Sequence, residues 1–225
     1  TTSNAVTMEA WIYPEISSNE NGHISSSGDF PNRNHQIYLI NNTNKLVIDG
    51  LTANPMISNS DIPHNEWTHI AVTFNLNETK LYINGVLDNT RIGNLTANNL
   101  GFDLTFGSQE SGTPSTWNWD GKMDEIRIWD DVRSASEILD NMNKELQGDE
   151  TGLLAYYNLS QGIPDVDNSS LTVVEDISSY NRDGIVIGFA KTGTSSNWVS
   201  GSPFLASPQT NAALYFDGVD AHLTI

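Results

Sequence analysis

The sequence contains no cysteine and few basic residues, and both absences exclude classes of function. Without cysteine, the chain can form neither disulfides nor a zinc site built on thiolates. Ten Lys and Arg stand against 28 Asp and Glu, which gives a formal net charge of −18. Because proteins hold nucleic acids by neutralising phosphates with basic side chains, this composition argues against a nucleic-acid partner.

Long apolar runs are absent as well. No stretch approaches the roughly 18 to 20 apolar residues that a membrane helix needs, so we expect no membrane insertion. Thr1 leads directly into a strand-like pattern without a signal peptide. We therefore expect the chain to be one segment of a longer protein.

Three catalytic signatures are also missing. The sequence has no Glu-x-Asp motif, a spacing with which many glycoside hydrolases place two carboxylates on either side of the glycosidic bond. It has no Gly-x-Ser-x-Gly motif for a serine nucleophile, and its five His lack the spacing of a zinc protease. We therefore expect a protein without enzymatic activity.

The residues that are present favour an all-β protein. Apolar side chains make up 37% of the chain, and 6 Trp, 7 Tyr and 7 Phe supply a large core. Asn84-Gly85 lies between two strand-like segments and is typical of a type I′ hairpin turn. We predict a jelly-roll sandwich of two antiparallel sheets with one short helix. The segments with strand periodicity are Thr7–Ile16, Trp67–Asn75, Lys80–Gly85, Lys122–Asp130 and Leu153–Leu159.

One segment departs from the strand pattern. Ser134 and Glu137 have the spacing of a capping box at a helix N-terminus. Ile138, Met142 and Leu146 then recur every four residues, as on the apolar face of a helix. We predict a helix of about three turns between Ser134 and Leu146.

Five segments stand in this order along the chain: MEAWIYP, NEWTHIAVTFN, TKLYINGVLDN, GKMDEIRIWDDVRSASEI and GLLAYYNLSQG. Together they resemble the laminin-G-like, concanavalin A-like jelly-roll domains of secreted and surface proteins. The resemblance extends over nearly the whole chain, and residues 156–204 are most similar to bacterial members that are repeated in large surface proteins of gliding Bacteroidetes and in extracellular polysaccharide-active proteins.

The resemblance implies a secreted or cell-surface module that mediates adhesion or binds a surface glycan or polysaccharide. Two alternatives remain open at this point. In the first alternative, the chain is a purely structural spacer repeat in a surface filament. In the second, it is a carbohydrate-binding appendage of a secreted polysaccharide hydrolase.

The resemblance also makes the C-terminal residues unusual. A strand pair similar to Ala213–Ile225 usually precedes the strand similar to VTMEAWIYP, so the family's usual first strands stand last here. We expect residues 1–225 to form one domain, because no linker divides them convincingly. We also expect this domain to be one period of a tandem array, with neighbouring repeats as partners. A circular permutant is the structural alternative.

Calcium is the cofactor that we expect. Asp217 and Asp220 flank a Gly turn, and the acid excess suits a cation that binds carboxylate and carbonyl oxygens. The resemblance implies a structural calcium between this turn and the strand that contains Asp124, with a carbonyl near Gly218. The alternative is that these Asp-Gly pairs are ordinary turn residues.

Aromatic residues in polar loops are candidates for sugar binding, because a pyranose ring stacks on Trp or Tyr. Trp117 and Trp119 lie among polar residues, and Arg33 lies in a second polar segment. We take these three as candidate ligand-binding residues. Core packing is the alternative for both tryptophans.

Overall fold

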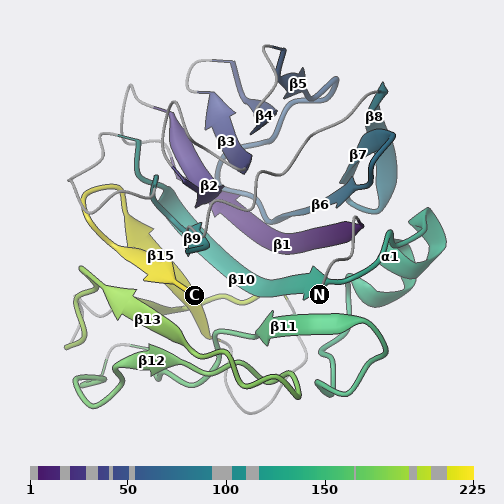
Figure 1. Cartoon of the computed structure of the whole chain (residues 1–225). Helices are drawn as coiled ribbons and strands as arrows, with labels where there is room; N and C mark the ends of the chain where they lie inside the picture. The colour runs from purple at the N-terminus through teal and green to yellow at the C-terminus, as the bar shows by residue number, and fades with distance from the viewer. Residues whose placement is uncertain are drawn as a thin grey trace.

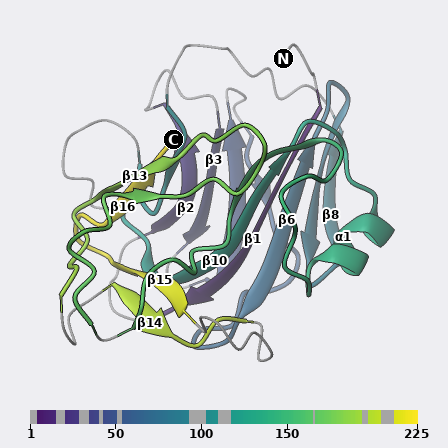
Figure 2. The same ribbon diagram turned by 90° about the horizontal axis from the view of Figure 1, so that it is seen from below.

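The computed structural model describes residues 5–15, 21–28, 35–40, 43–50, 54–92, 103–109, 117–164, 166–192, 197–203 and 212–225. Within these ranges, two eight-stranded antiparallel sheets pack face to face, with one short helix outside them (Figures 1 and 2). The predicted all-β sandwich is therefore confirmed. No helix in these parts of the chain has the length and apolar character of a membrane-spanning segment.

The first sheet, sheet A, has the strand order β14-β15-β10-β1-β6-β7-β8, and β11 also pairs with β10. Its strands are β1 (Val6–Pro14), β6 (Thr68–Phe74), β7 (Glu78–Ile83), β8 (Val86–Ile92), β10 (Asp120–Trp129), β11 (Leu153–Tyr157), β14 (Trp198–Ser200) and β15 (Ala212–Asp217).

The second sheet, sheet B, has the order β12-β13-β16-β9-β2-β3-β4-β5. Its strands are β2 (Gly22–Ser27), β3 (His35–Ile40), β4 (Lys45–Gly50), β5 (Met56–Ile57), β9 (Thr105–Phe106), β12 (Val173–Val174), β13 (Gly184–Ile187) and β16 (His222–Thr224).

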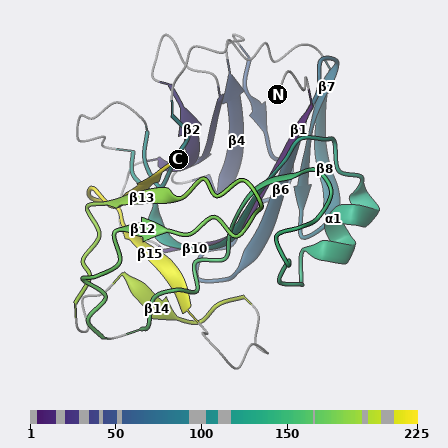
Figure 3. The same ribbon diagram turned by 60° about the horizontal axis from the view of Figure 1, so that its bottom comes forward.

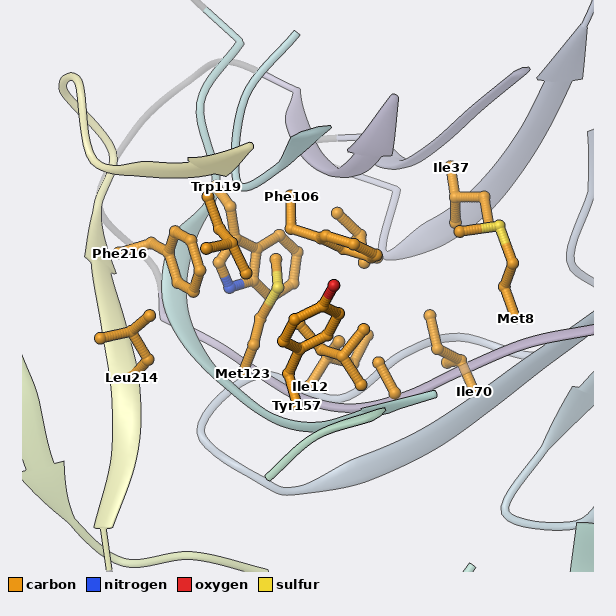
Figure 4. Packing of buried hydrophobic residues seen from close by; sticks show 14 of the residues in the cluster. Met8, Ile12, Ile37, Ile70, Phe106, Trp119, Met123, Tyr157, Leu214 and Phe216 are labelled. Carbon is orange, nitrogen blue, oxygen red and sulfur yellow. The ribbon is translucent and has the colours of Figure 1, made fainter. Parts of the chain in front are cut away.

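The core lies between the sheets because apolar side chains alternate along the strands. On β1, Met8, Ala10 and Ile12 face the interior, as the period of two requires. Leu214 and Phe216 of β15 enter the same core and are completely buried. Figure 4 shows these two side chains pointing into the packed interior. The main cluster therefore contains residues from both ends of the chain.

The predicted hairpin is confirmed. Ile83 of β7 pairs with Val86 of β8, so Asn84 and Gly85 form a two-residue turn. Both turn residues have positive φ, 49° and 75°, as a type I′ turn requires.

Helix α1 is shorter than predicted. It spans Ala135–Asn141, and its predicted capping box at Ser134 and Glu137 is present. Side chains from sheet A donate to the carbonyls at the C-terminal end of the helix, which have no partner within the helix. Nε1 of Trp11, for example, donates to the carbonyl of Met142 at 2.7 Å. Figure 3 shows the two-turn helix beside β6 and β8.

The C-terminal strands fold within their own chain. Strand β15 pairs with the first four residues of β10, and β16 lies between β13 and β9. Figure 1 shows β15, in yellow, alongside β10. That Ala213–Ile225 fills the place of the family's usual first strands, in one period of a tandem array, stays a prediction.

The burial of β15 predicts a large cost for truncating Phe216. Replacing a fully buried Phe by Ala removes apolar contacts and leaves a cavity, so we expect Phe216→Ala to lower the free energy of unfolding by about 3 to 5 kcal/mol. Urea denaturation measures this change. Val219→Ala, in the exposed turn after β15, is the control and should cost less than about 0.5 kcal/mol. Similar curves for the two variants would show that β15 does not belong to the core.

Candidate functional site

The outer face of sheet A is covered by helix α1 and the segment that follows it. Arg127 of β10 is 1% exposed and donates to the carbonyl of Asn141 at 2.9 Å. Beside it, Trp11 packs edge to face against His69, whose Nε2 lies 3.3 Å from a buried carboxylate oxygen of Glu9. This face is therefore occupied by the protein's own chain around β1 and β10.

Glu125 is the centre of the polar network on this face. Its Oε2 accepts from Arg127 at 2.7 Å, and both of its oxygens accept from the Tyr156 hydroxyl at 2.8 to 2.9 Å. Burial raises the pKa of Glu125 to about 7, and Arg127 and Tyr156 partly offset that effect. The charge of Glu145 adds to the increase. Glu125 therefore couples the stability of this face to pH.

The raised pKa predicts how stability depends on pH. The contribution of Glu125 is fully present below pH 4.5, its ordinary pKa, and is lost as the pH rises through about 7. The full loss corresponds to roughly 3 kcal/mol. We expect Glu125→Gln, which keeps a neutral group of the same shape at this position, to lack this decline.

Urea denaturation of both proteins at pH 5 and pH 8 measures the difference in slope. The exposed Glu66→Gln is the control and should keep the wild-type decline. Equal declines in wild type and Glu125→Gln would contradict the assignment.

The structure separates Asp124 from the other predicted calcium ligands, Asp217, Gly218 and Asp220, which lie in one turn. Asp217 pairs with Asp120, and Asp124 lies four residues further along β10, which is roughly 13 Å along the strand. Asp124 is 1% exposed on the covered outer face of sheet A, opposite Trp11, and burial raises its pKa well above the ordinary range. Within the described ranges, no group of three or more His, Asp and Glu is placed to hold a metal ion.

The Asp217 turn is satisfied by its own backbone instead. Oδ1 of Asp217 accepts from the backbone N–H of Val219 at 3.0 Å, and from Asp220 and Ala221 at 3.4 Å. Gly218 has φ +71° and donates its N–H to the carbonyl of Trp119. The residues therefore do not fit the calcium site implied by the resemblance, and calcium binding stays a prediction.

A calcium titration distinguishes a calcium site that includes Asp124 from one at the Asp217 turn alone. We expect Asp124→Asn to leave any calcium-dependent change in melting temperature intact, because Asp124 lies apart from the Asp217 turn. Asp217→Asn should remove such a change. Thermal melts of wild type and both variants, in calcium and in chelator, measure this. Loss of the calcium response in Asp124→Asn alone would contradict the observed register.

The outer face of sheet B carries a row of polar side chains. Four of these residues are neighbours across the sheet: Thr105 pairs with Ser26, Ser26 with Gln36, and Gln36 with Asp49. All four are buried. The amide nitrogen of Gln36 has no hydrogen-bond partner within the described part of the chain. This face therefore combines close packing with an unused donor.

An aromatic group lies next to this row and is named here the aromatic platform: Trp117, His23 and Tyr38. The Trp117 and His23 rings are stacked at 13° with centroids 5.6 Å apart, and the Tyr38 centroid lies 5.2 Å from that of His23. Nδ1 of His23 donates to the Trp117 carbonyl at 3.0 Å. Because Ile37 and Leu39 face the core, Tyr38 between them faces outward. Trp117 is 39% exposed, so the platform reaches the surface.

The three predicted ligand residues have different outcomes. Trp117 belongs to the aromatic platform. Trp119 is 1% exposed and its ring packs in the main core (Figure 4), as in the core-packing alternative, so its candidate role in ligand binding stays a prediction. Arg33 lies outside the described residues. Sequence reasoning missed His23 and Tyr38, although the outward position of Tyr38 in HQIYLI was a readable signal.

Comparison with known proteins agrees with this fold. The sequence profile of the concanavalin A-like lectin/glucanase superfamily matches residues 1–139. The chain belongs to this superfamily. The matched range ends within α1, so the strands from β11 to β16 lie beyond it. No curated protein sequence matches the chain.

Among solved structures, a Bacteroides ovatus protein with a proposed role in carbohydrate binding has a TM-score of 0.65 and 20% identity. The match covers 86% of this chain and 56% of that one, so the chain spans little more than half of its relative. A CBM40 domain of a Ruminococcus gnavus sialidase, bound to α2,3-sialyllactose, has a TM-score of 0.50 and 17% identity over 60% and 81% of the two chains. A Limulus polyphemus pentraxin also has a TM-score of 0.50, with 14% identity over 61% and 69%. At these identities the similarity establishes the fold.

Proposed function

We propose that this superfamily domain is a carbohydrate-binding module of a secreted or cell-surface bacterial repeat protein. The observation that carries the proposal is the aromatic platform on sheet B, where Trp117 is 39% exposed above a stacked His23. Superfamily membership and the carbohydrate-bound CBM40 relative support it. Binding without catalysis is part of the proposal, and adhesion through surface glycans is the role that we infer for it.

The physical basis is the shape and polarity of a pyranose ring. Its apolar C–H face packs on an aromatic ring, while its hydroxyls need hydrogen-bond partners. Trp117 offers the exposed ring, and Tyr38 lies beside it. Gln36 is two residues from Tyr38 on the same face of β3, but it is buried, so the exposed contact surface that we propose consists of the Trp117 and Tyr38 rings.

The charge of the chain favours neutral glycans. A net charge of −18 creates a negative potential around the domain that disfavours sialylated, uronic or sulfated ligands. The platform contacts described above are uncharged when His23 is neutral. We therefore expect neutral glycans to bind more tightly than acidic analogues with the same core, and expect salt to reduce that difference.

A glycan array followed by calorimetry with the best neutral glycan tests this function. Trp117→Ala should weaken binding at least about tenfold, which is about 1.4 kcal/mol, because the stacking surface is lost. The melting temperature should change little, because Trp117 is partly exposed.

Tyr180→Ala is the matched control, because it removes another exposed aromatic ring that is 47% accessible. This variant should keep wild-type affinity. Equal affinity in wild type and Trp117→Ala would rule out the platform as the binding site, and an array without neutral hits would rule out the proposed ligand class.

A further inference from the structure

We propose that the turn between β15 and β16, Asp217–Ala221, positions the aromatic platform, and that Asn118 is the positioning residue that joins them. This inference rests on the proposed function for its consequence in ligand binding. Its structural part concerns where Trp117 is held, and can be tested without a ligand.

Hydrogen bonds and strand pairing fix the backbone of the turn. Oδ1 of Asp217 accepts from three successive backbone N–H groups, those of Val219, Asp220 and Ala221. The pairing of Asp217 with Asp120 attaches the start of the turn to β10. A Cβ added to Gly218 would lie 3.1 Å from the Asp120 Cβ, and its φ is +71°, so the turn leaves little freedom there.

Two hydrogen bonds join this turn to residues 117–119. The backbone N–H of Gly218 donates to the Trp119 carbonyl at 3.0 Å. The side-chain amide of Asn118 donates to the carbonyl of Val219. Asn118 is only 6% exposed, so water can replace this bond only after local rearrangement.

The other side of the same segment is held by sheet B. The N–H of His23 donates to the Trp117 carbonyl at 3.1 Å, and the N–H of Trp119 donates to the Gly107 carbonyl at 2.8 Å. Residues 117–119 are therefore bonded to β2 and to Gly107, just after β9, on one side, and to the C-terminal turn on the other. Asn118 is the member of this segment whose side chain makes a bond to the turn.

This arrangement determines the direction of the two tryptophans. Trp119 is fixed in the core, and Trp117 is two residues away at the surface. Asn118 lies between them, and its bond to the turn restricts rotation of the segment. Loss of that bond should let the Trp117 ring leave its stack on His23 without removing Trp119 from the core.

Asn118→Asp tests the inference, because it keeps the size of the side chain and removes the amide donor. A carboxylate facing the Val219 carbonyl cannot make the bond. Asn89→Asp is the matched control: the Asn89 amide donates to the Ile57 carbonyl at 2.7 Å, at the edge of sheet A. Both variants thus remove one amide-to-carbonyl bond.

Acrylamide quenching of tryptophan fluorescence, measured well below the melting temperature, reports the exposure of Trp117. The Trp117→Phe protein provides the background from the other five tryptophans. We expect Asn118→Asp to raise the Trp117 quenching constant at least about twofold and to weaken the affinity for the best neutral glycan by about tenfold or more. Asn89→Asp should change neither quantity. Unchanged quenching in a folded Asn118→Asp protein would overturn the inference.

Asp217→Ala serves as the second variant if Asn118→Asp does not fold, because it loosens the turn from the opposite side. It should also raise Trp117 quenching, and wild-type quenching in this variant would overturn the inference.

The experiments distinguish failure of the proposed glycan binding from failure of the positioning role of Asn118. If wild type binds no glycan, the proposed function fails while quenching still decides the positioning role. If Trp117→Ala abolishes binding but Asn118→Asp leaves affinity and quenching unchanged, only the positioning role fails.

Discussion

The pairing of β15 with the start of β10 brings the C-terminal residues into the centre of the sandwich. Four residue pairs, from Asp120 with Asp217 to Met123 with Leu214, hold the two strands in register. That register buries Leu214 and Phe216 in the main core. It also places the turn after β15 against residues 117–119, which carry the exposed tryptophan. Core and candidate site therefore depend on the same strand pair.

The two outer faces of the sandwich have different uses. On sheet A, helix α1 and the carbonyls that follow it cover a buried network around Arg127 and Glu125. Buried charged groups are costly unless they are paired and hydrogen-bonded. The side chains on this face are therefore used to satisfy one another and are not open to a ligand. On sheet B, the aromatic platform reaches the surface beside a polar row. This division is the physical reason for assigning ligand binding to sheet B.

Much of the fold was predictable from the sequence, because strand periodicity and turn chemistry are local. The hairpin at Asn84-Gly85 and the capping box at Ser134 follow from a few adjacent residues. The length of α1 was not predictable, because its end depends on Trp11 and Arg127 from distant strands. The residues of the candidate site were harder to predict than the fold. Trp117 and Trp119 share the same local pattern, and only the packing of both sheets separates the exposed ring from the buried one.

The calcium prediction also rests on a local pattern that does not determine how a turn uses its carboxylate oxygens. Asp-Gly turns look alike in sequence whether carboxylate oxygens face a cation or backbone N–H groups, and here Asp217 caps its own turn. Trp117 is the tryptophan that we propose contacts the sugar. The most direct measurement follows the six indole N–H signals by NMR during titration with the best-binding neutral glycan. We expect a large, saturable shift of the Trp117 signal, whereas the signals of the core tryptophans should hardly move. A Trp117 signal that stays in place while the glycan binds would contradict it.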